Sequence, residues 1–170
     1  MDTRLKSLVT MLGLGALLLV AALWGWAAVS KPFPEREGTA VCVDRAFAEG
    51  DPIRRGHVTI SVLNAGTRNG LAGLTLDLFI DAGFAEGQSG NVPEGSPRVR
   101  NVEIWTADPQ HPAVRLVAAQ LSDAARVVRR EPTTAGVQVV VGDRFQSLSK
   151  GPRRIKADRD VEICGPPPVA

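Results

Sequence analysis

The clearest hydrophobic pattern of the chain runs from residue 57 to residue 82. Residues 57–63 alternate in character and are rich in β-branched side chains, which is typical of a β-strand. Residues 64–70 contain two glycines and two asparagines, which favour the positive φ angles of a tight turn. One face of a helix follows, formed by Leu71, Leu74, Thr75, Leu78 and Ala82. We expect Asn69 to be the N-cap of this helix and Gly83 to end it.

Strand patterns return after this helix. Residues 84–88 form a short predicted strand, and residues 89–97 have the composition of a loop. Residues 99–107 alternate well enough for a further strand, which places Val102 and Trp105 on opposite sides.

A second helix is predicted from Pro112, because proline suits the first helical position. Its apolar stripe consists of Val114, Val117, Ala118, Leu121 and Ala125. The positions that face away are Arg115, Ser122, Asp123 and Arg126. Residues 129–135 are polar and turn-like, and residues 137–141 form an apolar run typical of a buried strand.

The order of these elements is strand–helix–strand, then strand–helix–strand. Such a chain most simply forms a two-layer α/β sandwich, in which two helices cover one face of a four-stranded sheet. Short β-prone runs at residues 40–43 and 160–164 extend this domain at its N- and C-terminal sides.

Three short motifs carry a resemblance to a known family. Residues 62–66 (Val-Leu-Asn-Ala-Gly), 70–72 (Gly-Leu-Ala) and 82–84 (Ala-Gly-Phe) resemble the signature of the LytR C-terminal domain family. The resemblance extends over residues 57–145 and implies a domain of bacterial envelope proteins. It implies no catalytic residues, because the isolated domain of this family has none to carry over.

The N-terminal part predicts a membrane anchor. Residues 7–29 contain no charged residue, and as a helix they would be about 34 Å long, enough to cross a bilayer core. Arg4 and Lys6 favour a cytoplasmic N-terminus at residues 1–6. A cleaved signal peptide is the alternative, and both interpretations place the following residues outside the cytoplasm. With this anchor, the chain is similar to single-pass envelope integrity proteins of actinobacteria.

Two segments flank the predicted domain. Residues 30–56 read as a linker with an N-terminal extension, and residues 146–170 as a basic C-terminal tail. The net charge is only +2, and the expected compartment argues against nucleic acid. Local clusters at Arg98/Arg100, Arg129/Arg130 and residues 153–159 could attract anionic headgroups or acidic wall polymers, or form a solvated surface.

Cys42 and Cys164 are the only cysteines. Each lies in a β-prone run outside the predicted domain, in a compartment that favours oxidation. We predict a structural disulfide that places the two runs side by side. Two independent thiols or a redox-active or lipidated cysteine are the alternatives, and no Cys-x-x-Cys motif or lipoprotein box supports the functional ones.

Leu76 and Ile80 project away from the predicted helix stripe, where a two-layer fold would expose them. Either the disulfide-linked extensions cover them, or they form a partner surface. We favour coverage.

The turn is the one candidate ligand loop. It resembles a phosphate-binding loop in outline, with Asn64, Gly66, Arg68, Asn69 and Gly70 as its candidate residues. Neither Gly-x-Gly-x-x-Gly nor the P-loop motif is present, so tight-turn packing is the favoured interpretation.

No other chemistry is assembled in the sequence. His57 and His111 lack metal-ligand spacing, and we expect them to be surface or helix-capping residues. Asp143 is expected to serve a turn. We therefore predict no catalytic residue, no metal and no cofactor.

Three classes of function remain. The favoured one is a non-enzymatic, membrane-anchored module that binds envelope proteins or wall polymers and supports envelope integrity. The alternatives are an anion or glycan receptor that uses the turn, and an accessory factor of a cell-wall glycopolymer phosphotransferase. The sequence leaves the oligomeric state and the partner open.

Overall fold

The computed structural model describes residues 3–29, 42–121 and 125–167, and the chain divides into two compact units, Met1–Thr39 and Ala40–Ala170. The first unit contains helix α1 (Thr3–Val29). Within the part of the chain that the structure describes, no helix combines the length and apolar character needed to cross a membrane. Of the expected linker and N-terminal extension at residues 30–56, residues 30–41 lie outside the described residues.

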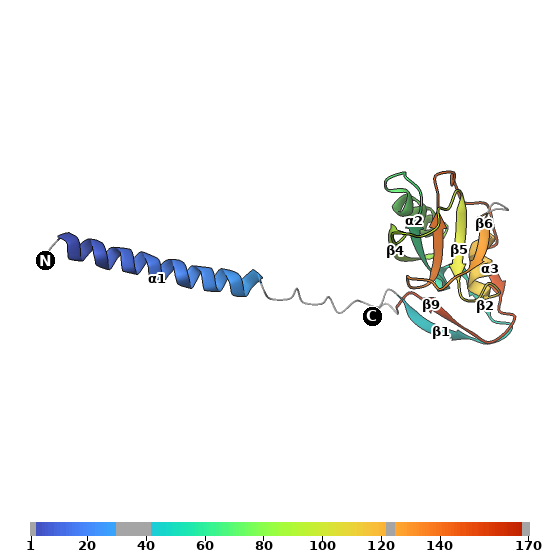
Figure 1. The fold of residues 1–170 in the computed structure, drawn as a ribbon. Coiled ribbons are helices and arrows are strands. Elements are labelled where there is room, and N and C mark those ends of the chain that lie inside the picture. Colours follow the sequence, from blue (N-terminus) through green and yellow to red (C-terminus); the bar gives the residue numbers. More distant parts are fainter. Residues whose placement is uncertain (1–2, 30–41, 122–124, 168–170) are drawn as a thin grey trace. The chain divides into compact units, whose positions relative to one another are not determined.

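The second unit is built around a five-stranded sheet with the order β4-β3-β7-β5-β6 (Figure 1). Its strands are β3 (Thr59–Asn64), β4 (Ala85–Asn91), β5 (Val102–Thr106), β6 (Ala125–Arg129) and β7 (Val137–Val141). Helices α2 (Leu71–Asp81) and α3 (Pro112–Ala118) connect β3 to β4 and β5 to β6. Each helix therefore joins two parallel neighbours, and the result is a mixed α/β fold.

Strand β7 joins the two β-α-β units. It pairs parallel with β3 and antiparallel with β5, and all five of its residues are buried. This confirms the prediction of a buried strand at residues 137–141, because a central strand covered on both faces needs apolar side chains on both faces.

The four-stranded prediction is wrong by one strand, because residues 125–129 form β6 and not the end of a helix. Helix α3 stops at Ala118, and the buried Gln120 side chain then donates hydrogen bonds to the carbonyls of Leu116 (3.1 Å) and Pro152 (3.0 Å). Val127 and Val128 favour an extended backbone and pair with β5. Ser122 and Asp123, predicted to face away, lie outside the described residues.

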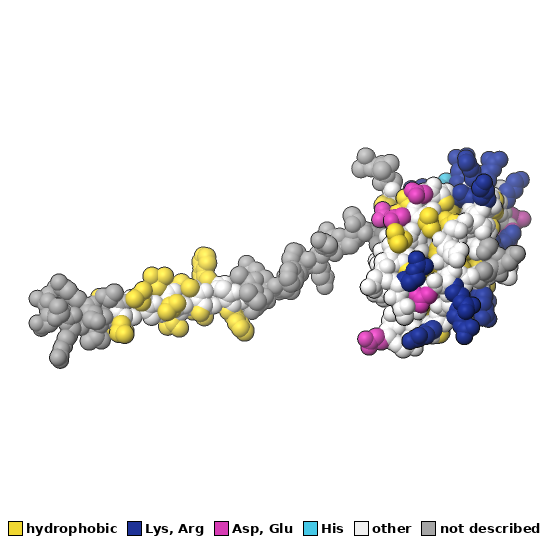
Figure 2. All heavy atoms as spheres, turned by 90° about the horizontal axis from the view of Figure 1, so that it is seen from above, with side chains coloured by type: hydrophobic (Ala, Val, Ile, Leu, Met, Phe, Trp, Pro, Cys, Tyr) yellow, Lys and Arg dark blue, Asp and Glu magenta, His cyan; other side chains and the backbone are white. Residues whose placement is uncertain are grey.

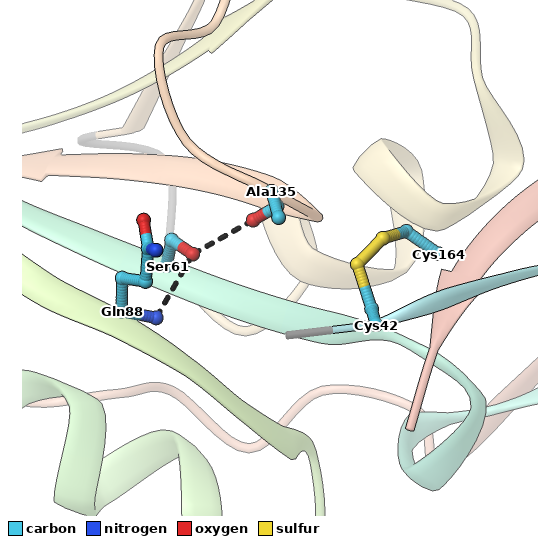
Figure 3. Close-up of a disulfide and its surroundings, with 5 residues drawn as sticks. All are labelled: Cys42, Ser61, Gln88, Ala135 and Cys164. Atoms are coloured by element: carbon cyan, nitrogen blue, oxygen red, sulfur yellow. Dashed lines mark hydrogen bonds between the residues drawn. A yellow bond between two sulfur atoms is a disulfide. The ribbon is translucent and has the colours of Figure 1, made fainter. Parts of the chain in front are cut away.

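Strand β4 is longer than the predicted 84–88 segment, and it contains a β-bulge opposite Ser61. The register shifts between Ile60 and Val62, and the Ser61 hydroxyl accepts a hydrogen bond from the Gln88 amide (3.1 Å). The same hydroxyl donates to the Ala135 carbonyl (2.7 Å), so Ser61 satisfies polar groups on both sides of β3 (Figure 3).

The sheet has a hydrophobic core on each face. The larger one unites α2 and α3 with sheet residues such as Val62, Ile104 and Val139, so both helices lie on one face, as predicted. The smaller one contains Leu63, Val99, Trp105 and Val140. Trp105 therefore lies on the side opposite Val102, as the alternation predicts.

The caps of α2 differ from the prediction at one end only. Gly70, with φ of 74°, is the N-cap in place of Asn69. Gly83 ends the helix as expected: it has φ of 92°, and its amide donates to Ile80 while the Phe84 amide donates to Phe79. The rings of Phe79 and Phe84 also meet edge to face at 5.5 Å, which completes a Schellman-type cap.

The flanking segments belong to the folded unit. Strand β1 (Val43–Phe47) pairs antiparallel with β9 (Val161–Gly165), and β2 (Pro52–Arg54) pairs with β8 (Arg154–Lys156). Residues 154–165 of the expected tail are therefore largely strand. A short 3₁₀ helix (Arg55–His57) follows β2 and leads the chain toward β3.

A disulfide joins Cys42 to Cys164, which confirms the predicted pairing and the predicted adjacency of the two runs (Figure 3). We refer to β1, β9 and this disulfide together as the disulfide arm. In Figure 1 the two strands of the arm run side by side at one end of the sheet.

Candidate functional site

The turn after β3 is closed by its own side chains. The amide oxygen of Asn64 accepts a hydrogen bond from the Gly66 backbone (2.9 Å), and its amide nitrogen donates to the Arg68 carbonyl (2.9 Å). Asn64 is buried, so these bonds hold residues 64–68 in one conformation.

Asp143 fills the position that an external anion would take in this turn. Its carboxylate accepts hydrogen bonds from the backbone amides of Thr67 (2.8 Å) and Arg68 (3.0 Å) and from the Thr67 hydroxyl (3.1 Å). The amide of Thr67, followed by that of Arg68, holds the pKa of Asp143 below its ordinary value of 3.8. Gly66 packs directly against this carboxylate, and a Cβ atom there would overlap it.

The predicted ligand loop is therefore not an open anion cradle in this structure. Two amides of the kind that would bind a phosphate already donate to Asp143. The Arg68 guanidinium donates to the Phe145 carbonyl at 3.3 Å, and Gly70 serves α2 as its N-cap. The expected turn role of Asp143 is correct, but its partners are Thr67 and Arg68, more than 70 residues away along the chain.

Beside this closed turn lies an open polar groove of about 730 Å³. It is lined by Ala65, Gly66, Thr67, Arg98, Val99, Arg100, Asp143 and Arg144. The residues come from the carboxyl ends of β3 and β7 and from the segment that enters β5. We call this feature the arginine groove, after Arg98, Arg100 and Arg144.

Backbone contacts bring the three arginines together. The Gly142 amide donates to Asn101 (2.7 Å) and the Arg144 amide donates to Arg100 (2.9 Å), so the two segments lie against each other. The close approach requires glycine, because a Cβ on Gly142 would overlap the Val99 carbonyl. Val99 is buried, whereas Arg98 and Arg100 on either side of it are exposed.

The arginines of the groove have no ion-pair partner among the described residues, although the Asp143 carboxylate also lines the groove. Among the described residues, the guanidinium groups of Arg98, Arg100 and Arg144 form no ion pair and donate no hydrogen bond to protein. Two arginines outside the groove form ion pairs, Arg115 with Asp158 (2.6 Å) and Arg159 with Asp108 (2.5 Å), whereas others such as Arg154 do not. Figure 2 shows that Lys and Arg side chains gather in groups on the surface of the folded unit.

The two histidines have structural roles, as expected. The Nδ1 atom of His111 accepts from the Ala113 amide (3.2 Å) and caps α3, while its Nε2 atom lies 3.2 Å from the Glu162 carbonyl of the disulfide arm. The ring of His57 lies 5.2 Å from the ring of Phe47. Burial, followed by the charges of Arg54 and Arg45, lowers the pKa of His57 below 6.5.

The described residues contain no group of three or more His, Cys, Asp or Glu side chains that could hold a metal ion. A second cavity of about 200 Å³ lies between the disulfide arm and the end of the sheet, and His111, Trp105 and Glu162 are part of its lining.

Leu76 and Ile80 of α2 are covered in the structure, which agrees with the favoured interpretation and not with the alternative of a partner surface. Leu76 is only 5% exposed and Ile80 is partly buried against the core, because the sheet covers this side of the helix. The helix is apolar on nearly all sides, and of its predicted stripe Leu71 and Thr75 are buried. The exposed leucines are Leu74 (61%) and Leu78 (37%), which belong to the predicted stripe.

The mixed sheet, the disulfide arm and the arginine groove together define a small disulfide-linked α/β domain. Residues 57–145, just over half of the chain, match the family model described as LytR cell envelope-related transcriptional attenuator. The chain belongs to this family. The matched range coincides with that of the resemblance read from the sequence motifs.

Comparison with solved structures gives one match, the soluble domain of a conserved hypothetical secreted protein from Mycobacterium marinum. The two chains are 22% identical, with a TM-score of 0.44, and the match covers 59% of this chain and 68% of the other. Comparison with curated proteins gives no match.

Proposed function

We propose that this chain is an extracytoplasmic interaction module that supports cell envelope integrity and acts by binding a partner, without turnover. The observation that carries the proposal is the arginine groove, in which Arg98, Arg100 and Arg144 form no ion pair with a described residue and outnumber the one carboxylate of the lining, Asp143. Exposed guanidinium groups grouped around a groove are suited to bind an oxyanion-bearing partner. The envelope-related description of the family agrees with such a role.

The proposal includes an N-terminal membrane anchor, and this part rests on the sequence. Residues 7–29 carry no charge, and they lie within the continuous helix α1. Apolar side chains along this helix are exposed, among them Leu12 (69%), Leu17 (69%) and Leu18 (71%). The Cys42–Cys164 disulfide supports an oxidising compartment for the folded unit.

Site-specific photo-crosslinking in native membranes tests the binding function. A photoreactive amino acid replaces Arg100 in the full-length chain, and a matched control replaces Arg154, an exposed arginine of β8 outside the groove. We expect a discrete crosslinked envelope component, protein or polymer, from position 100 and not from position 154. Equal crosslinking from both positions, or none from either, would overturn the proposal.

The location is tested in intact cells. We expect added protease to degrade the folded unit from outside while an N-terminal tag stays protected. Protection of the whole chain would rule out an extracytoplasmic module.

A further inference from the structure

We propose that the ligand of the arginine groove is an extended polyanion, a chain whose successive units carry phosphate or carboxylate groups. The inference rests on the proposed binding function and specifies its ligand class. It assigns Arg98, Arg100 and Arg144 as the residues that contact the anionic groups.

The arrangement of the arginines favours several anionic groups over one. Arg98 and Arg100 are separated by the buried Val99, so their Cα atoms lie up to about 7 Å apart along the segment. Arg144 joins them from a different segment, through its backbone bond to Arg100. Three guanidinium groups presented from two segments can each take a separate oxyanion of one chain.

The turn that lines one side of the groove does not provide a compact site for a single small anion. The amides of Thr67 and Arg68 are already used by the Asp143 carboxylate. What remains are long, exposed side chains, whose individual ion pairs in water are weak. Binding of useful strength then requires several contacts to one molecule, because linked groups bind at high effective concentration.

The lining of the groove does not suit a lipid surface. Insertion at a membrane interface requires exposed apolar side chains next to the basic ones. Among the described residues of the folded unit, the exposed large hydrophobic ones are Val43, Leu74, Leu78 and Val127, and none of them lines the arginine groove. Its lining is mainly polar, and Val99, its one large apolar residue, is buried.

The test measures binding of fluorescent long-chain inorganic polyphosphate and of polygalacturonate to the full-length chain in detergent. The groove variant is Arg98→Gln/Arg100→Gln/Arg144→Gln. The matched control is Arg153→Gln/Arg154→Gln/Lys156→Gln, which removes the same amount of charge from exposed residues outside the groove. Circular dichroism and thermal unfolding of each variant show whether the fold is intact.

We expect at least one polyanion to bind the wild type with an affinity that falls as salt is added. The groove variant should bind it at least tenfold more weakly, and the control less than threefold. Inorganic phosphate should not compete at concentrations equal in phosphate groups. Comparable losses in both variants would show attraction by net charge alone and would overturn the inference, as would effective competition by inorganic phosphate.

Vesicles of phosphatidylglycerol provide the membrane arm. Groove-dependent binding to vesicles without groove-dependent binding to either polyanion would replace the polymer by a lipid surface. If neither polyanion binds but position 100 still crosslinks an envelope component, the ligand class is wrong and the proposed function stands. If both experiments fail, the proposed function fails as well.

Discussion

The Arg55 guanidinium donates a hydrogen bond of 2.6 Å to the side-chain oxygen of Gln120, which lies 65 residues farther along the chain. It also donates to the carbonyls of Ala82 (2.9 Å), Gly151 (2.8 Å) and Pro152 (3.1 Å). Gln120 is only 1% exposed. This pair therefore links the end of α2, the turn after α3 and the segment that leads to β8.

Replacement of Arg55 by alanine should lower the free energy of unfolding by about 2–4 kcal/mol, because the buried Gln120 oxygen and three carbonyls lose a charged donor. Urea unfolding at neutral pH measures the change. Arg154→Ala is the matched control, since this exposed arginine makes no side-chain hydrogen bond among the described residues. Equal stability of wild type and Arg55→Ala would show that the contacts contribute nothing.

Leu76 and Leu74 provide a test of the orientation of α2. Leu76→Ala should cost about 2–5 kcal/mol, because Leu76 is 5% exposed and its removal leaves a cavity. Leu74→Ala should change stability by less than about 0.5 kcal/mol, because Leu74 is 61% exposed. Thermal or urea unfolding of both variants measures the difference, and the reverse order would mean that the helix buries the other face.

Loss of the disulfide should destabilise the folded unit strongly. The bond joins residues 122 positions apart, and closing such a loop stabilises by about 4–5 kcal/mol in the chain-entropy model. The Cys42→Ser/Cys164→Ser variant should melt lower by on the order of 15 °C. A reducing agent should lower the melting temperature of the wild type and leave the variant unchanged. An unaltered wild-type melting curve on reduction would exclude a stabilising role.

Asp143 should give the closed turn a defined pH dependence. Its pKa is held below 3.8 in the folded state, so the unfolded chain takes up the proton first as the pH falls. The contribution of Asp143 to stability is complete above the unfolded pKa and is lost as the pH falls through the folded one.

Amide NMR shifts should report this titration. The Thr67 and Arg68 amide protons should move together, with a midpoint below 3.8. In Asp143→Asn both signals should lose that titration. A midpoint at or above 3.8 in the wild type would contradict the assigned hydrogen bonds.

Local sequence patterns predicted the elements that periodicity and backbone preference specify by themselves. The strand at 137–141 and the Gly83 cap follow from periodicity and backbone preference, which act within a few residues. The Cys42–Cys164 pairing was predicted because the chain offers only two cysteines.

Predictions failed where the deciding contacts are distant. Val127 and Val128 of β6 pair with β5. Helix α3 ends before Gln120, whose side chain forms hydrogen bonds with Arg55 and Pro152. The apolar periodicity that predicted a helix as far as Ala125 contains no information about either contact. For α2, leucines on several sides left the buried face undetermined until the sheet selected one.

The candidate site was predicted only in part. The clustered Arg98 and Arg100 were visible in the sequence, but Arg144 joins them through a backbone contact that no local pattern encodes. The role of Asp143 was underestimated for the same reason, since Thr67 and Arg68 precede it by more than 70 residues.

The disulfide arm also determines how the folded unit bears mechanical load. A force that pulls residues 42 and 164 apart acts on a covalent bond before it reaches any strand of the sheet. Tension between these two points therefore leaves the hydrogen-bond ladders of β3, β5 and β7 unstretched. We therefore expect the domain to stay folded under a pulling force applied at residues 42 and 164.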